Sequence, residues 1–373
     1  MEAERPLSLR TGELDHLSNT IDAIYLLGFS NEEIAECLNK GGLLSIELEF
    51  TKKCNLRCLY CYSAAGEPAE NELSIKELQS AILQAKELGA KKIILLGGGE
   101  PLLFGGFRDI VEFIHSLGLQ QILFTNGTLL TGKEAEFLYK NKVSVVIKHN
   151  SFKPEVQDML TSIAGSFNKI QRGLRFLREA GYPYRDAMLG IQTVICRQNK
   201  EELPAMWTWA RENRIIPYFE ILTYQGRAKQ NNFLNLSVVE IQTVFKDIEI
   251  IDRERFGITW QAHPTVAAFS CKRHLYSCLI NSQGYIQPCT GVDIRVGNIR
   301  EKSLDYILRN SEIIRNLRNI YNKIEGPCRD CEYRCECYGC RGNAYQITGN
   351  YLASDPTCWR YEKINNESLT HFC

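Results

Sequence analysis

Short apolar segments alternate with helix-like segments along the first two thirds of this chain, and that alternation constrains the fold more than any other feature of the sequence. Six runs rich in apolar and β-branched residues, each bounded by turn residues, lie at 43–49, 92–96, 121–125, 143–148, 188–195 and 215–222. Helical patterns fill the intervals, at 74–88, 106–117, 132–141, 166–180 and 201–213, and a capping box of Ser74 and Glu77 opens the first of them. Strands joined by helix-length connections pair in parallel through right-handed crossovers. The sequence therefore predicts an α/β fold, an open six-stranded parallel (β/α)6 partial TIM barrel.

The alternation stops near residue 260, which indicates a different kind of domain beyond it. There cysteines become dense, glycine and proline interrupt short segments, and a single helical pattern remains at 303–321. Upstream of the barrel, 13–40 is typical of two helices, the second opened by a capping box of Ser30 and Glu33. The predicted parts are an N-terminal helical cap, the barrel and a small cysteine-rich, metal-dependent domain, at residues 1–42, 43–260 and 261–373.

The balance of charge limits the partners that this chain can attract electrostatically. Its 44 lysines and arginines equal its 44 aspartates and glutamates, so nothing favours nucleic acid or an anionic membrane. The N-terminus is charged without an apolar core, and no apolar run reaches the roughly 18 residues that span a bilayer. We therefore predict a cytoplasmic protein with no nucleic-acid and no membrane partner. In that reducing compartment, 15 cysteines are expected to be metal ligands or catalytic thiols instead of disulfides.

Three cysteines, Cys54, Cys58 and Cys61, follow the first predicted strand in the spacing C-x3-C-x2-C. That position is the carboxyl edge of the sheet, where α/β barrels place their chemistry. Three thiolates on one loop can ligate three irons of a [4Fe–4S] cluster and leave the fourth iron open, whereas a structural zinc normally takes four protein ligands. On spacing alone, a zinc site or a plain structural loop remains the alternative.

The second predicted strand ends on the same edge in the sequence GGGEP, from Gly97 to Pro101. Together with the cysteine run and Tyr60 before the third cysteine, this ending resembles the radical S-adenosylmethionine (SAM) family. The resemblance implies that the three cysteines hold a [4Fe–4S] cluster whose open iron is chelated by SAM. It also implies reductive cleavage of SAM to a 5′-deoxyadenosyl radical, hydrogen abstraction from a substrate, and a reductant such as flavodoxin or ferredoxin.

The resemblance further implies a set of contacts to SAM. Glycines would let the backbone approach the ligand, Glu100 would accept hydrogen bonds from the SAM ammonium, and Tyr60 would lie near the adenine. A plain strand-to-helix turn is the alternative role for the glycines. Where many relatives carry a Ser-x-Asp motif near the ribose, this chain has Lys148, His149 and Asn150. The predicted cofactor-binding residues are Tyr60, Gly98, Gly99, Glu100, Pro101, Asn126, Asn150 and Ile195.

The cysteines after residue 270 form a second pattern. Locally, their C-x2-C pairs also fit a zinc ribbon. Together with the segments 296–304 and 340–358, they resemble the SPASM extension of radical SAM enzymes. The likeness implies two fully ligated auxiliary clusters, which brings the expected total to three [4Fe–4S] clusters. The first would be held by Cys271, Cys278, Cys289 and Cys340, and the second by Cys328, Cys331, Cys337 and Cys358.

Four thiols lie outside these sets: Cys37, Cys196, Cys335 and Cys373. The simplest interpretation of each is a small buried apolar residue or a tolerated surface thiol, although Cys335 lies inside the second set and could replace a neighbour. Cys196 and Cys373 are candidate hydrogen donors should the reaction be an epimerisation. Glu220, on the sixth strand, is a candidate for substrate binding or proton transfer, and Arg227 for a substrate carboxylate. For both, a structural ion pair is the alternative.

The substrate is predicted less directly than the chemistry. The resemblance favours modification of a peptide or protein by oxidation, cross-linking or epimerisation, since SPASM enzymes mostly do this. The alternative is a dehydrogenase or decarboxylase acting on a small metabolite such as a sugar, an aminocyclitol or a tetrapyrrole. A hypothesis of another class is a non-catalytic iron–sulfur or zinc protein that transfers electrons or binds a partner.

Overall fold

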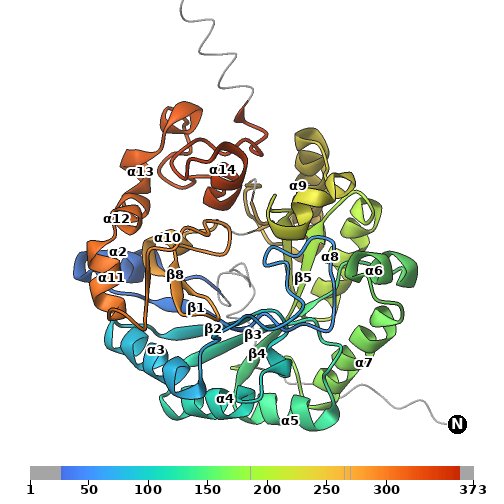
Figure 1. Cartoon of the computed structure of the whole chain (residues 1–373). Coiled ribbons are helices and arrows are strands. Elements are labelled where there is room, and N and C mark those ends of the chain that lie inside the picture. The colour runs from blue at the N-terminus through green and yellow to red at the C-terminus, as the bar shows by residue number, and fades with distance from the viewer. Residues whose placement is uncertain (1–26, 185, 264, 269, 362–373) are drawn as a thin grey trace, which may run out of the picture.

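The computed structural model describes residues 27–184, 186–263, 265–268 and 270–361. In it the sheet is curved and helices lie on its outside (Figure 1). All six predicted strands form, and each pairs in parallel with the next along the chain. They are β1 Ser45–Thr51, β2 Lys92–Gly98, β3 Gln120–Thr125, β4 Val143–Lys148, β5 Leu189–Ile195 and β6 Ile216–Ile221. The predicted α/β fold with a parallel sheet is confirmed.

The sheet continues beyond β1, so the predicted number of strands is too low. β7 (Leu279–Ile280) pairs in parallel with β1, and β8 (Tyr285–Gln287) and β9 (Gly297–Asn298) follow in antiparallel order, giving nine strands. The three added strands come from the cysteine-rich region. Each is only two or three residues long, too short to show the alternation that marks a strand in a sequence.

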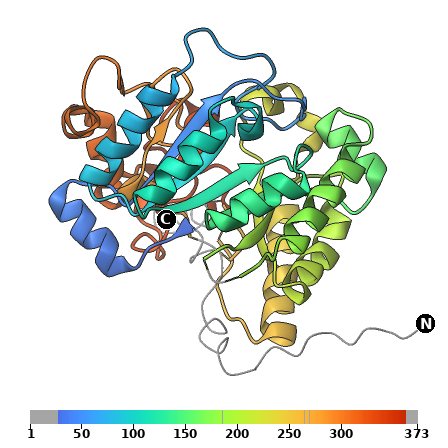
Figure 2. The ribbon, with the colours of Figure 1, turned by 90° about the horizontal axis from the view of Figure 1, so that it is seen from below.

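Helices cover the outer face of the sheet, and the view from below shows them lying in front of the strands (Figure 2). The five patterns predicted between strands all form helices. These are α3 Ile75–Glu87, α4 Phe107–Ser116, α5 Gly132–Lys140, α7 Ser166–Glu179 and α8 Leu203–Glu212. Two further helices, α6 (Pro154–Thr161) and α9 (Val238–Ile251), pack against α7 and α8 and were not predicted.

Capping residues fix the starts of two helices as predicted. Ser30 and Glu33 form a capping box at α2 (Asn31–Lys40), and Ser74 and Glu77 form one at α3. The other helix expected in the N-terminal cap falls mainly on residues 13–26, outside the described residues. None of the helices in the described part of the chain is both long enough and apolar enough to cross a bilayer.

The region after β6 is more broken than predicted. The single helical pattern at 303–321 is wrong as a continuous helix, because Ser311 adopts an extended conformation and its hydroxyl accepts a bond from Ile314 N. The segment therefore divides into α11 Leu304–Asn310, α12 Glu312–Arg318 and α13 Ile320–Lys323. Two other short helices are α10 (Arg273–Tyr276) and α14 (Arg341–Thr348).

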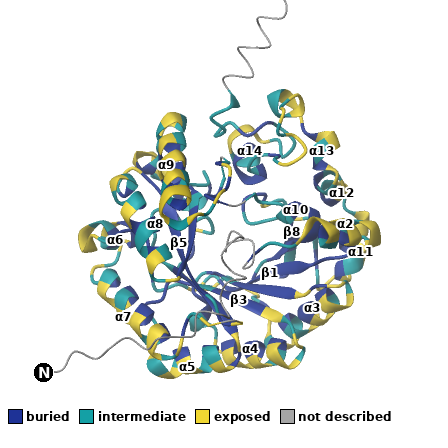
Figure 3. Ribbon diagram, turned by 180° about the vertical axis from the view of Figure 1, so that it is seen from behind, coloured by how far each residue is buried: buried dark blue, intermediate teal, exposed yellow. Residues whose placement is uncertain are grey.

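The parallel strands are buried on both faces (Figure 3). Outward side chains join the large core shared with the helices. Inward side chains form a smaller cluster that includes Ile94, Ile122, Val146 and Ile216. Nearer the carboxyl ends of β4, β5 and β6 the inward positions become polar, with Lys148, Gln192 and Glu220. This change from apolar to polar places a site inside the curve of the sheet.

Candidate active site and cluster sites

A cavity with about 1150 Å³ of space between its atoms, part of it open to solvent, lies at the carboxyl ends of the parallel strands. It brings together the cysteine loop after β1, the glycine-rich end of β2 and the inward residues of β4 to β6. The sequence-predicted residues that line it are Cys54, Cys58, Cys61, Tyr60, Gly98, Gly99, Glu100, Asn126 and Glu220.

The glycine-rich end of β2 is bonded directly to the start of the cysteine loop. Gly99 N donates to Thr51 O at 2.7 Å, and Glu100 N donates to Lys53 O at 2.9 Å. A Cβ on Gly99 would lie 2.1 Å from Lys53 O, and Gly98 has a φ of +67°. Gly99 is therefore required by the approach of one backbone to another, and Gly98 by its left-handed conformation. The glycines thus form the turn that the sequence analysis gave as their alternative role.

A 3-10 turn after β6, η3 (Gly226–Gln230), holds the cysteine loop from the other side. Arg227 N donates to Cys61 O at 3.0 Å. Its side chain donates from Nε to Cys58 O at 2.7 Å and from Nη1 to Ala65 O at 2.9 Å. The guanidinium is thus bonded to loop carbonyls, which is a different role from the predicted contact with a substrate carboxylate.

The carboxyl of Glu100 is almost fully buried at the edge of the cavity. Oε1 accepts from Thr125 Oγ1 at 2.6 Å, and Oε2 accepts from Asn126 N at 2.8 Å. Burial raises the pKa of Glu100 to about 7, although these hydrogen bonds oppose the shift. A carboxylate has about four lone-pair sites, so Glu100 can still accept a bond from a ligand in the cavity. Asn126 also donates from Nδ2 to Asn55 Oδ1 at 2.9 Å.

Asn150 supports Tyr60 instead of lining the cavity itself. Its Nδ2 donates to the Tyr60 hydroxyl at 2.7 Å, and its Oδ1 accepts from Val194 N at 2.9 Å. Asn150 is fully buried. The amide nitrogen and the amide oxygen of Asn150, which was expected to contact the cofactor, are therefore both bonded to the protein. Asn150 instead orients the Tyr60 ring toward the cavity.

Several other predicted residues lie away from the cavity wall. Side chains alternate across β5, so Val194 lines the cavity while Ile195 lines a neighbouring hollow. Cys196 is buried among apolar side chains, and burial raises the pKa of its thiol to about 11. Pro101 is buried and begins the 3-10 turn η1 (Pro101–Leu103). Cys373 lies outside the described residues.

Two charged side chains in the cavity form a pair. Lys148 Nζ lies 3.7 Å from Glu220 Oε1, and the two side chains are 27% and 26% exposed. Gln192 Nε2 also donates to Glu220 Oε1. Sequence reasoning singled out Glu220 but treated Lys148 only as a departure from a motif. Lys148 is the last residue of β4, and the alternation of side chains along the strand points it inward. That position could have identified it as a cavity residue from the sequence.

The comparisons with known proteins agree with this geometry. A model of the radical SAM superfamily matches residues 48–210, and a model of the SPASM iron–sulfur cluster-binding domain matches residues 271–332. The AdoMet-dependent heme synthase of Methanosarcina barkeri (strain Fusaro) is 30% identical over 340 residues, covering 84% of this chain and 95% of that protein. The chain belongs to the radical SAM superfamily. It is thus a radical SAM enzyme with a SPASM domain, and its cofactors are SAM and iron–sulfur clusters.

Proteins named for other substrates are also similar to this chain. The PqqA peptide cyclase of Granulibacter bethesdensis is 25% identical over 345 residues, covering 85% of this chain and 86% of that protein. A solved structure of anSMEcpe with bound AdoMet and a Cp18Cys peptide superposes with a TM-score of 0.65 at 17% identity, covering 88% of this chain and 97% of that one. The last likeness shows the fold alone.

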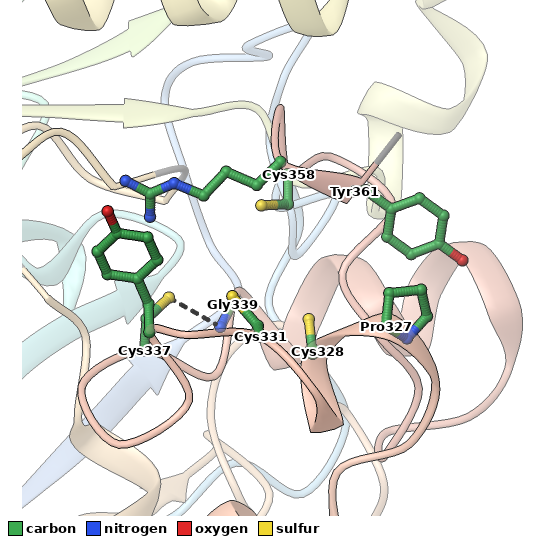
Figure 4. Close-up of a pocket in the computed structure, with 9 residues that line it drawn as sticks. Pro327, Cys328, Cys331, Cys337, Gly339, Cys358 and Tyr361 are labelled. Carbon is green, nitrogen blue, oxygen red and sulfur yellow. Dashed lines mark hydrogen bonds between the residues drawn. The ribbon is translucent and has the colours of Figure 1, made fainter. Parts of the chain in front are cut away.

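In the SPASM region of this radical SAM enzyme, one predicted set of four cysteines surrounds a single cavity. Cys328, Cys331, Cys337 and Cys358 line a space of about 420 Å³, and Figure 4 shows their sulfurs around it. Cys337 Sγ accepts from Gly339 N at 3.3 Å. No three Cys, His, Asp or Glu side chains of the described residues meet closely enough to hold a single metal ion. The sulfurs border a cavity, and the donor set fits a cluster with several irons.

The other predicted set lies at the ends of four elements. Cys271 and Cys278 precede α10 and β7, Cys289 follows β8, and Cys340 caps the start of α14. Cys289 Sγ accepts from Val292 N at 3.3 Å, and Cys340 Sγ accepts from Asn343 N at 3.4 Å. Burial, with Asp355, Cys289 and Cys271 nearby, raises the pKa of Cys340. Hydrogen bonds to sulfur favour the thiolate that binds iron.

Cys278, the fourth member of that set, is buried, and it senses the charges of Arg318 and Glu47. The cysteines outside both sets differ in their surroundings. Cys37, within α2, is buried, whereas Cys335 is exposed. These positions agree with the simple interpretation of Cys37 as an apolar core residue.

Proposed function

We propose that this enzyme oxidises a carboxylate-bearing side chain of an iron tetrapyrrole, using SAM and three [4Fe–4S] clusters. The observation that carries the proposal is the single cavity that unites the cysteine loop, the glycine-rich strand end and the cation of Lys148. Its likeness to a heme synthase, over nearly the full length of that protein, supports the substrate class.

Some of these residues would hold the cofactors, and others shape the cavity. Cys54, Cys58 and Cys61 would hold the SAM-binding cluster, and the two SPASM sets would hold auxiliary clusters. When bound, these groups supply a one-electron reductant, a radical that abstracts hydrogen and a one-electron acceptor. Arg227 fixes the cysteine loop, and Glu100 offers an acceptor to the SAM ammonium.

The cavity wall suits a flat apolar ring that carries carboxylates. Leu96, Phe124 and Tyr218 provide apolar surface, and Lys148 provides a positive charge. Conversion of a propionate into a vinyl group removes carbon dioxide, one hydrogen atom and one electron. The hydrogen acceptor and electron acceptor named above balance that change. We also propose that a reductant such as flavodoxin or ferredoxin supplies electrons in the cytoplasm. The proposed domain boundaries lie near residues 42 and 260.

The test is an anaerobic assay of the reconstituted, reduced protein with SAM and iron coproporphyrin III. We expect about 12 irons per chain, 5′-deoxyadenosine and methionine, and a porphyrin that has lost carbon dioxide and two hydrogen atoms per converted side chain. Mass spectrometry measures all the organic products together. SAM cleavage with unchanged porphyrin would reject the substrate, and no SAM cleavage by cluster-loaded protein would reject the site.

A peptide substrate is the second candidate, and one feature favours it. A hollow of about 780 Å³ adjoins the cavity, shares Ile221 and Leu222 with it, and extends to Leu236 and Ile347. An extended apolar segment would fit such a path. The peptide-acting relatives make this the natural alternative. Turnover of a cysteine-containing peptide, in the same assay, by protein that leaves iron coproporphyrin III unchanged would favour it.

A further inference from the structure

We propose that Lys148 is the substrate-positioning residue of this enzyme, and that its ammonium binds a carboxylate of the substrate in the cavity. The proposal deepens the proposed function, because it assigns one side chain to the anionic group of that substrate. It rests on the position of Lys148, on its partners and on the charges around it.

The position of Lys148 directs its side chain into the cavity. It is the last residue of β4, at the edge of the sheet where ligands of parallel α/β folds bind. Its partner in register on β5 is Gln192, which also lines the cavity. Its Nζ lies 5.6 Å from the centre of the Tyr60 ring, so the aliphatic part of the side chain is held beside the cysteine loop.

The ammonium of Lys148 is left with unused donor capacity. It has three N–H groups, and in the described part of the chain its Glu220 partner, at 3.7 Å, lies beyond hydrogen-bond distance. The carboxylate of Glu220 is instead bonded by Gln192. The side chain of Lys148 is 27% exposed, so burial removes most of its hydration. An anion bound beside Nζ would replace the hydration that burial removes.

Other cations near the cavity make more bonds to the protein. Arg227 donates to carbonyls of the cysteine loop. Arg273, which also lines the cavity, donates to Glu47 and to Tyr218, and only its buried Nε has no partner among the described residues. Lys148, at the end of β4, has no hydrogen bond of its own among the described residues and is the charged donor that we assign to an incoming carboxylate. The carboxylate of SAM is the competing partner, and the experiment separates the two.

The test compares wild type with Lys148→Met, Lys148→Arg and Lys142→Met, all with full iron content. Lys142, directly before β4 and paired with Asp186 at the surface, is the matched control because it lies at the opposite end of the same strand. Binding of iron coproporphyrin III is followed by its absorbance, and binding of its tetramethyl ester is followed in parallel. SAM affinity and 5′-deoxyadenosine formation without porphyrin are measured on the same samples.

We expect Lys148→Met to weaken porphyrin binding about ten- to hundredfold and to remove the preference for the free acid over the ester. Lys148→Arg should retain much of that preference, and SAM affinity should stay within about twofold in all variants. An equal loss of SAM affinity in Lys148→Met would overturn the proposal, as would unchanged porphyrin binding. If wild type binds no porphyrin, both this proposal and the proposed function fail, whereas equal binding by wild type and Lys148→Met rejects this one alone.

Discussion

Arg273 Nη1 donates to Glu47 Oε1 at 2.7 Å, in a pair that connects the SPASM region to the first strand of the barrel. The same guanidinium donates from Nη2 to the Tyr218 hydroxyl, on β6, at 3.0 Å. Because β1 and β6 are the outer strands of the six-stranded parallel part, one side chain bridges the gap that an open barrel leaves. The C-terminal region thus completes the wall of the cavity.

The Arg273 bridge leads to a stability prediction. Arg273→Met should lower the free energy of unfolding by about 3–5 kcal/mol, because it leaves the Glu47 carboxylate buried and unpaired. Thermal unfolding followed by circular dichroism measures the loss. Arg309→Met, which removes an exposed pair with Asp305, is the control and should cost less than about 1 kcal/mol. The double variant Glu47→Gln, Arg273→Met should recover part of the stability, and no recovery would show that the charge is not the cause.

The contacts of Arg227 with the cysteine loop predict a selective loss of iron. In Arg227→Met the loop loses two side-chain bonds, to Cys58 O and Ala65 O, while the two SPASM sets are untouched. A chelator should therefore remove about 4 of about 12 irons faster than in wild type. Arg197→Met, which breaks a surface contact with Glu240, is the control. Equal loss from all clusters would contradict the prediction.

The structure also explains which of these features a sequence can reveal. The six parallel strands and five of the helices were predictable because their periodic patterns are long, and the capping boxes fix where two helices begin. β7, β8 and β9 were not, because they exist only by pairing with β1 and with one another.

The site divides in the same way. Residues of short motifs, such as Cys54 and Glu100, were found from spacing and lie together at one cavity. The sequence predicts ligand contacts for Asn150 and Arg227, but each side chain is hydrogen-bonded to a residue far along the chain, Tyr60 and Cys58 respectively. Ile195 was assigned to the cavity, although the alternation of β5 gives that place to Val194. Only the folded register decides such cases.

The raised pKa of Glu100 predicts how stability changes with pH. An acid whose pKa is higher in the folded state favours folding while protonated, and this contribution is lost as pH rises from the ordinary value, 4.5, through the folded value, about 7. Wild type should therefore lose melting temperature between about pH 4.5 and pH 7 relative to Glu100→Gln, with little further change above that range. Saturating SAM should reduce that loss in wild type, because an ammonium beside the carboxylate favours its charged form. Parallel pH profiles of the two proteins would contradict this assignment.

The cluster cysteines give the last prediction, which separates making the radical from using it. Replacing Cys54, Cys58 and Cys61 together by Ala should abolish SAM cleavage and leave about 8 irons in a folded protein, because the SPASM cysteines lie in another region of the chain. Replacing Cys328 and Cys331 should do the reverse. These two line the cavity of about 420 Å³ in a segment that carries little apolar core of its own, so thermal stability should fall while SAM cleavage persists. The 5′-deoxyadenosine then formed should exceed the substrate product, since an oxidation needs an electron acceptor. Substrate turnover at the wild-type ratio in that double variant would show that the second auxiliary site is structural only, and the oxidative part of the proposed function would lose its support.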